Sequence, residues 1–206
     1  MAERPADRRP ERLQRQVVVA LESVGAIILD RRIRFEQPQL WKTKGEVLSR
    51  LRDQGLSVGW ERTRSCSARR SQRHGHHGCG ICGGCVLSAV SARVAGLTQP
   101  AGHYAFDILA CEDKALADDG SRRAMSRGER AVAARSLGLM QEFAHLAVTP
   151  DGVLIADREA RLISRNDPGF AQMKLLGLLR QHHAEWATFM SCLPARSWVR
   201  EIVGQP

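Results

Sequence analysis

Four of the six cysteines in this chain of 206 residues lie within one short segment. The segment reads Cys66-x12-Cys79-Gly80-Ile81-Cys82-Gly83-Gly84-Cys85. Zinc in structural sites takes four ligands in a tetrahedron, and cysteine thiolates are common among them. A Cys-Gly-x-Cys turn presents two thiolates on one side of a tight loop, because glycine permits the turn conformation. We therefore predict one zinc ion bound by all four thiolates of the segment, those of Cys66, Cys79, Cys82 and Cys85.

Three other interpretations of this cluster stay open. An iron–sulfur cluster also uses four thiolates and Cys-x2-Cys-x2-Cys spacing, although the glycines of the turn favour zinc. A mixed zinc site would use His74, His76 or His77 in place of one cysteine. Four unrelated free thiols are disfavoured by the regular spacing. The two remaining cysteines, Cys111 and Cys192, are expected to be small core residues.

Two predicted helices flank the cysteine segment. One runs over 86–94, so its N-terminus, which favours negative charge, lies beside Cys85. The other begins after Thr43 and reaches about residue 54, because Thr43 and Glu46 have the spacing of a capping box. Lys44 and Glu46 are candidate substrate-binding residues, and the pattern assigns no catalytic residue. The simpler alternative is that Glu46 only caps the helix and Lys44 is only solvated.

The N-terminal part is expected to contain one helix and one strand. Apolar residues at helical spacing, from Leu13 to Val24, predict a helix over 11–24 that ends at Gly25. Alternation around Ile33 and Phe35 predicts a strand, which Pro38 ends.

The C-terminal part is expected to be helical. Periodic apolar residues predict helices over 128–147 and 167–193, with a turn at 149–152 between them. Residues 98–127 carry many charges and turn residues and are expected to form a surface connection with a short helix. Four large side chains are interpreted as packing or ordinary helix residues and not as ligands: His182, His183, Trp186 and Trp198. The chain is therefore expected to be mostly α with a minor β part.

The composition bears on partners and location. Net charge is +9, which favours an anionic partner such as RNA or DNA, but only 5% of residues are aromatic, which leaves few platforms for stacking bases. A solvated arginine-rich surface is an equal alternative. No apolar run is long enough for a membrane span, and residues 1–10 lack the apolar stretch of a signal peptide. A cytoplasmic protein is expected, with a homodimer among its possible forms.

Three motifs taken together resemble a known family. They are the Lys-x-Glu helix start at Lys44 and Glu46, the pair Ser65-Cys66, and the Cys-Gly-x-Cys-x-x-Cys run of 79–85. In this order they resemble the C-terminal half of QueC-like proteins. These are the 7-cyano-7-deazaguanine synthases of queuosine biosynthesis, in the PP-loop ATP pyrophosphatase superfamily, and their relatives in phage-defence operons. The resemblance covers residues 11–97, with the zinc knuckle at 66–85, and leaves 98–206 as a helical tail region.

This resemblance implies an α/β fold and an ATP-dependent ligation. The fold would be the C-terminal portion of a PP-loop, adenine nucleotide alpha hydrolase-like domain. A 7-carboxy-7-deazaguanine is adenylated at its carboxylate and attacked by ammonia, giving an amide and then a nitrile. The resemblance makes the four cysteines zinc ligands and places Lys44 and Glu46 in the family's Lys-x-Glu motif.

Two features depart from the family. Its N-terminal half carries a Ser-Gly-Gly-x-Asp-Ser phosphate loop, and these 206 residues contain no such run. The basic residue that often follows the last cysteine is replaced by the run Ser88-Ala89-Val90. ATP and Mg²⁺ are therefore expected only if an N-terminal half, in a separate chain or a truncated frame, supplies the loop. The alternatives are a zinc-knuckle module that binds nucleic acid and a non-catalytic subunit of a defence complex.

Overall fold

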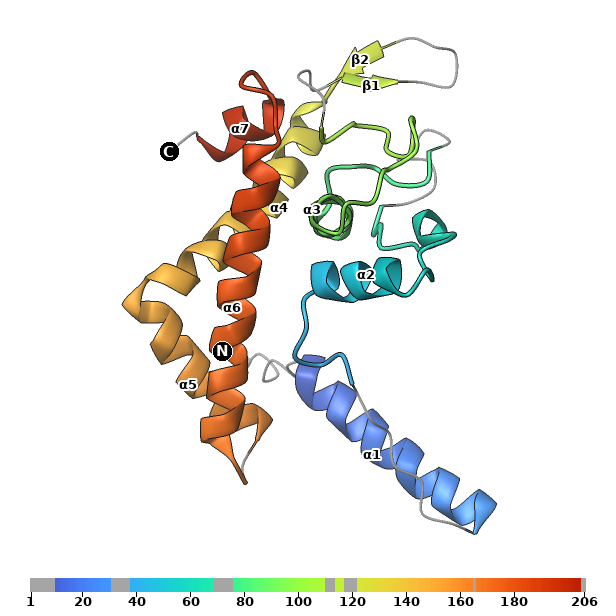
Figure 1. The fold of residues 1–206 in the computed structure, drawn as a ribbon, viewed down its shortest axis with the longest axis vertical. Helices are drawn as coiled ribbons and strands as arrows, with labels where there is room; N and C mark the ends of the chain where they lie inside the picture. Colours follow the sequence, from blue (N-terminus) through green and yellow to red (C-terminus); the bar gives the residue numbers. More distant parts are fainter. Residues whose placement is uncertain are drawn as a thin grey trace, which may run out of the picture. The chain divides into compact units, whose positions relative to one another are not determined.

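The computed structural model describes residues 10–30, 38–68, 76–109, 114–116, 122–164 and 166–204. Most of these residues lie in helices, and within these ranges the only sheet is a pair of short strands (Figure 1). The prediction of a mostly α chain with a minor β part is confirmed. The chain divides into two compact units, Met1–Leu40 and Trp41–Pro206. Among the described helices, none combines the length and the apolar character needed to cross a membrane.

The first unit contains helix α1, Pro10–Leu29. The predicted end at Gly25 is wrong, because the helix continues through Gly25 and the apolar residues that follow it. One glycine inside a helix costs only about 1 kcal/mol relative to alanine, so it need not end one. The backbone instead leaves the helix at Asp30, which has a positive φ of 47°. The predicted strand around Ile33 and Phe35 lies outside the described residues.

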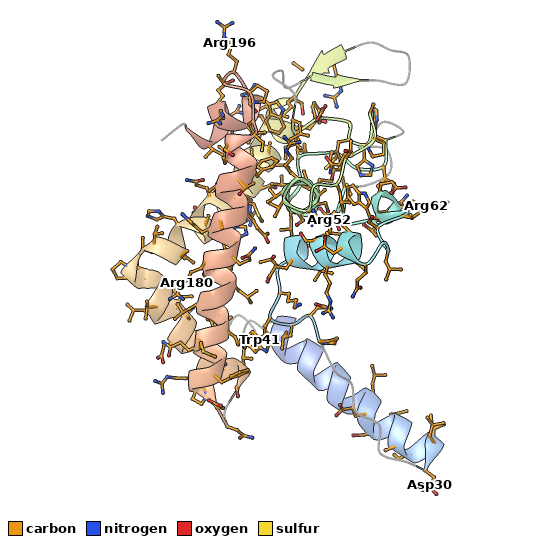
Figure 2. All side chains as sticks on the ribbon, viewed as in Figure 1. Asp30, Trp41, Arg52, Arg62, Arg180 and Arg196 are labelled. Atoms are coloured by element: carbon orange, nitrogen blue, oxygen red, sulfur yellow. The ribbon has the colours of Figure 1, made fainter. Side chains whose placement is uncertain are left out.

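The second unit begins with α2, Lys44–Asp53, whose predicted capping box is confirmed. A short 3-10 helix, η1 (Trp60–Arg62), follows, and then α3, Gly83–Val94. Helix α3 starts before the predicted Val86, because Cys82 is extended and serves as the N-cap. Arg52, labelled in Figure 2, joins α2 to α3 by donating from Nη1 to the Ala95 carbonyl at 2.6 Å.

Residues 98–127 are not simply a surface connection, as the sequence predicted. Tyr104 and Phe106 are only 7% and 1% exposed, so this part of the segment belongs to the core. Further along, β1 (Lys114–Leu116) pairs antiparallel with β2 (Arg122–Ala124). A core segment without helical or strand periodicity gives no sequence signal of its burial.

The helical tail has more elements than predicted. Two long helices were expected and are present as α4, Arg127–His145, and α6, Pro168–Ser191. The predicted turn at 149–152 is wrong, because these residues begin an additional helix. Proline suits the first position of a helix, where its missing N–H has no intrahelical partner anyway. The elements not expected are η3 (Leu146–Val148), α5 (Pro150–Ile163) and α7 (Trp198–Val203).

Helices α5 and α6 form an antiparallel pair (Figure 1). The buried residues of α5 are Gly152, Ala156 and Ala160, and α6 buries Ala171. At Gly152 a Cβ would lie 1.8 Å from the Leu146 carbonyl oxygen, so only glycine fits. The interpretation of 149–152 as a turn from the sequence is the reason that α5 was missed.

One apolar core joins the cysteine segment to α4, α6 and α7. It continues across residues 97 and 98, where the sequence predicted a division into two regions. Trp186 and Trp198 are 4% and 2% exposed, and the prediction that they anchor the packing is confirmed. His182 is buried as an ordinary helix residue and contacts the Met140 carbonyl at 3.1 Å. Cys192 is exposed, so its prediction as a core residue is wrong, and Cys111 lies outside the described residues.

Candidate metal centre

The backbone around the cysteines is held by a segment far along the chain. The Gly78 N–H donates to the His103 carbonyl at 3.1 Å, and the Ala105 N–H donates to the Gly78 carbonyl at 2.9 Å. The Phe106 N–H then donates to the Cys79 carbonyl at 3.1 Å. These bonds hold the turn that carries the cysteines in place without any regular sheet.

Two glycines are required for this turn. Gly80 has a positive φ of 82°, and a Cβ there would lie 1.9 Å from the Phe106 carbonyl oxygen. Gly84 has ordinary dihedrals, but its Cβ would lie 1.9 Å from the Ser65 carbonyl oxygen. Ser65 precedes Cys66, so the close approach at Gly84 brings the distant cysteine to the start of α3. Nothing lies within 4 Å of a Cβ at Gly83, although it is the neighbouring residue.

The four predicted thiols come together at one point. Their Sγ atoms all lie within 4.8 Å of one another, with 3.9 Å between Cys79 and Cys85 and 4.0 Å between Cys66 and Cys82. Sulfur atoms placed tetrahedrally at about 2.3 Å from a zinc ion are about 3.8 Å apart. The arrangement can therefore hold a single metal ion such as zinc, with four sulfur ligands and no histidine.

The sulfur distances also bear on the alternatives. A disulfide needs its two sulfur atoms at about 2.0 Å, much closer than these. An iron–sulfur cluster places several iron and sulfide atoms between its thiolates, which holds them further apart than one ion does. His76 and His77 have other contacts: the His76 Nδ1 lies 2.6 Å from the Gly102 carbonyl, and the His77 Nε2 lies 3.1 Å from the Thr63 carbonyl. His74 lies outside the described residues.

The thiols are buried and polarise one another. Cys79, Cys82 and Cys85 are 6% exposed or less, and Cys66 is partly exposed. The pKa of Cys82 is lowered, because the thiols of Cys79 and Cys85 donate hydrogen bonds to its thiolate. The contact with Cys82 raises the pKa of Cys79 to about 12, and the contacts with Cys79 and Cys82 raise the pKa of Cys85, with burial adding to both. Several thiolates are thus disfavoured together unless a cation neutralises them.

Lys44 lies beside this centre and is not merely solvated. Its Nζ donates to the Ser65 hydroxyl at 2.9 Å and to the Ser88 hydroxyl at 2.6 Å. Burial lowers the Lys44 pKa, and attraction to the Cys85 thiolate opposes that change. Ser88, which lies on α3, provides one of these hydroxyls to Lys44.

Glu46, the second candidate substrate-binding residue, is engaged in the helix cap. Its Oε2 accepts from the Thr43 N–H at 2.8 Å, and its own N–H donates to the Thr43 hydroxyl at 3.1 Å. The two candidates therefore differ: the Lys44 side chain points to the metal centre and Glu46 stabilises the start of α2.

Two residues beside the centre were missed by sequence reasoning. His103 stacks on His77 with 4.7 Å between ring centroids, and its pKa is lowered, chiefly by burial. The Tyr104 hydroxyl donates to the Cys85 carbonyl at 3.4 Å, and burial raises the pKa of this phenol. Together with Trp60, Ser65 and Ser88, these side chains line a shallow pocket at the cysteine cluster. Nothing in the sequence near residue 103 signals that it meets the cysteines.

Comparisons with known proteins do not add to this geometry. No family model, no curated protein and no solved structure matches the chain.

Proposed function

We propose that Cys66, Cys79, Cys82 and Cys85 bind one zinc ion with a structural role. The observation that carries the proposal is the mutual distance of the four sulfur atoms, which fits the edges of a tetrahedron around one ion. Four protein ligands leave no open coordination position for a substrate or an activated water. The ion would connect the segment at Cys66 to the start of α3 and so close one wall of the adjacent pocket.

We further propose that the chain acts as the zinc-bearing C-terminal part of a QueC-like enzyme. The support is that three motifs of the resemblance meet at one place: Lys44 contacts Ser65, which precedes Cys66, and Ser88, one turn after Cys85. An N-terminal half with the phosphate loop would hold ATP and Mg²⁺. Lys44 would then attract the carboxylate of a 7-deazaguanine substrate, or the ATP phosphate that it attacks, during adenylation, as a mobile point charge.

Metal analysis and X-ray absorption of freshly purified protein test the zinc site. We expect close to one zinc per chain, coordinated by sulfur alone. Cys82→Ser should lose the metal, whereas Cys192→Ser should keep it, because Cys192 is exposed and outside the cluster. Iron with acid-labile sulfide, or full metal content in Cys82→Ser, would contradict the proposed centre.

The enzymatic proposal is tested by reconstitution. The chain alone should neither bind Mg-ATP tightly nor convert 7-carboxy-7-deazaguanine with ammonia, because convergent amides are needed to hold the triphosphate. Addition of an N-terminal half with a phosphate loop should produce turnover. Turnover by the chain alone would show that it holds ATP in another way. No turnover with any such half would favour the nucleic-acid-binding module or a non-catalytic subunit.

In the reconstituted pair, Lys44 and Glu46 should differ. Lys44→Met should abolish most turnover with little change in melting temperature. Glu46→Ala should leave turnover largely intact and lower helix stability by about 1 kcal/mol, as expected for loss of a cap. Full turnover of Lys44→Met would leave the metal centre as the only functional site supported by the geometry.

A further inference from the structure

A buried acidic residue from the helical tail lies against the start of α2. Glu185, on α6, is only 2% exposed. Its Oε1 accepts hydrogen bonds from the Thr43 hydroxyl and, at 3.1 Å, from the Gln181 side-chain amide. Its Oε2 is buried and has no hydrogen-bond partner among the residues that the structure describes. A buried carboxylate with an unsatisfied oxygen is costly, so its position calls for an explanation.

Gly45 shows how closely this carboxylate approaches α2. A Cβ at Gly45 would lie 2.6 Å from Oε1 and 2.8 Å from Oε2 of Glu185, so the carboxylate occupies the space of a side chain. Peptide dipoles place partial positive charge at the N-terminus of a helix, which stabilises an anion there. The Glu185 carboxyl group, which comes from α6, therefore lies at the positive end of α2, whose cap Thr43 and Glu46 form.

The same end of α2 carries Lys44. Thr43 is the N-cap and Lys44 the first residue of the helix. From this position the Lys44 side chain reaches the hydroxyls of Ser65 and Ser88 at the metal centre. Both the place and the direction of Lys44 thus depend on where α2 begins. On the other side, Thr43 and Gly45 contact Glu185.

We propose that Glu185 is a positioning residue: it holds the N-terminus of α2, and with it Lys44, against the metal centre. The helical tail is by this inference part of the candidate site and not only a support for the core. The inference rests on the proposed metal centre but not on ATP chemistry. It explains why Gly45 and Glu185, which are 140 positions apart in the printed sequence, are packed into direct contact.

The test measures how accessible the Lys44 amine is in the intact, metal-loaded chain. The protein is labelled briefly with an amine-reactive ester, and mass spectrometry gives the labelling rate of Lys44 relative to Lys174 in the same sample. The variants are Glu185→Ala and Glu185→Gln. The matched control is His182→Ala, because His182 is also buried on α6 but contacts the Met140 carbonyl and not α2. Melting temperature and zinc content are measured for each protein.

Glu185→Ala should raise the relative labelling of Lys44 at least about fivefold, because the start of α2 opens locally. His182→Ala, compared at a temperature where both variants are folded, should leave it nearly unchanged. Glu185→Gln should restore most of the protection, since its amide oxygen can still accept from Thr43; it also serves if Glu185→Ala does not fold. Labelling of Lys44 in Glu185→Ala no greater than in the control would overturn the proposal. If Glu185→Ala does not fold, a rise of Lys44 labelling in folded Glu185→Gln would overturn it, because the amide keeps the acceptor for the Thr43 hydroxyl. Zinc missing from the unsubstituted protein would contradict the proposed metal centre itself. The labelling rates would then still show whether Glu185 holds the start of α2 and Lys44 in place.

Discussion

The cysteine segment and the α5–α6 pair reach a defined structure by opposite means. Between Thr63 and Cys82 the described backbone forms no helix or strand, and its position depends on glycine turns, three hydrogen bonds to residues 103–106 and four converging thiols. The α5–α6 pair consists of regular helices that pack on one another, with Ala156 and Ala160 of α5 and Ala171 of α6 among their buried residues. A chelator or a chemical change of one cysteine is therefore expected to act first on the cysteine segment, whereas the α5–α6 pair depends on helix packing.

Each region also has a glycine that tolerates no side chain and one that does. In the cysteine segment, Gly84 is in close contact and Gly83 is open. In the helical pair, Gly152 is in close contact and Gly177 is open. These matched positions allow the two regions to be perturbed separately.

Removal of the metal should have the largest effect and should be confined to one region. Structural zinc in small sites contributes about 10–16 kcal/mol of apparent binding free energy, which becomes folding free energy of the segment it holds. With a strong chelator, amide hydrogen exchange should increase first over 63–68 and 76–82, while α5 and α6 keep their protection. Simultaneous loss of protection in both regions would show that the whole second unit depends on the metal.

Metal affinity should depend steeply on pH. In the metal-free protein the raised pKa values keep Cys79 and Cys85 as thiols at neutral pH. Metal binding must release at least these two protons, so affinity should rise about hundredfold per pH unit around neutrality and fall equally as pH decreases. Competition with a chromophoric chelator, corrected for the chelator's own protonation, measures the slope. A slope near zero would mean that the thiolates exist before the metal binds.

Gly84→Ala should weaken metal binding without unfolding the tail. The added methyl group would displace the Ser65 carbonyl, and Cys66 with it. Loss of such a supporting contact typically lowers metal affinity about 10–100-fold. Gly83→Ala is the control and should bind metal as the unsubstituted protein does. Equal affinities for both variants, measured by the same competition assay, would show that the segment can shift to accommodate the methyl group.

Gly152→Ala should have the smallest effect, and it should destabilise the helical pair while leaving the cysteine segment unchanged. Its methyl group would meet the Leu146 backbone, and such overpacking costs about 1–3 kcal/mol of unfolding free energy. Metal affinity should not change. Gly177→Ala has open space and should gain about 0.5–1 kcal/mol, because alanine suits a helix interior better than glycine. Denaturant unfolding of the metal-loaded proteins measures the unfolding free energy of both variants. A loss of metal from Gly152→Ala would show that the two regions are energetically coupled.

Local chemistry was readable from the sequence. The four cysteines were identified as one ligand set because metal coordination needs particular side chains at close spacing, and both features are visible in the chain itself. The Thr43–Glu46 capping box was predicted for the same reason, since its partners are three residues apart. Long apolar periodicity indicated α4 and α6, although glycine inside α1 and proline at the start of α5 were misread as helix ends or turns.

Only the tertiary structure decided which distant residues complete the site. Tyr104 and His103 reach the cysteines through backbone bonds that no periodic pattern signals. Thr43 and Glu185 are separated by 142 positions, and neither is unusual in its own helix. The burial of Ala156 and Ala160 on α5 likewise appears only once the neighbouring elements are in place. Sequence identified the four cysteines as one candidate ligand set, because their chemistry is local. Packing determined the position of Lys44 beside them, because that depends on contacts from the other end of the chain.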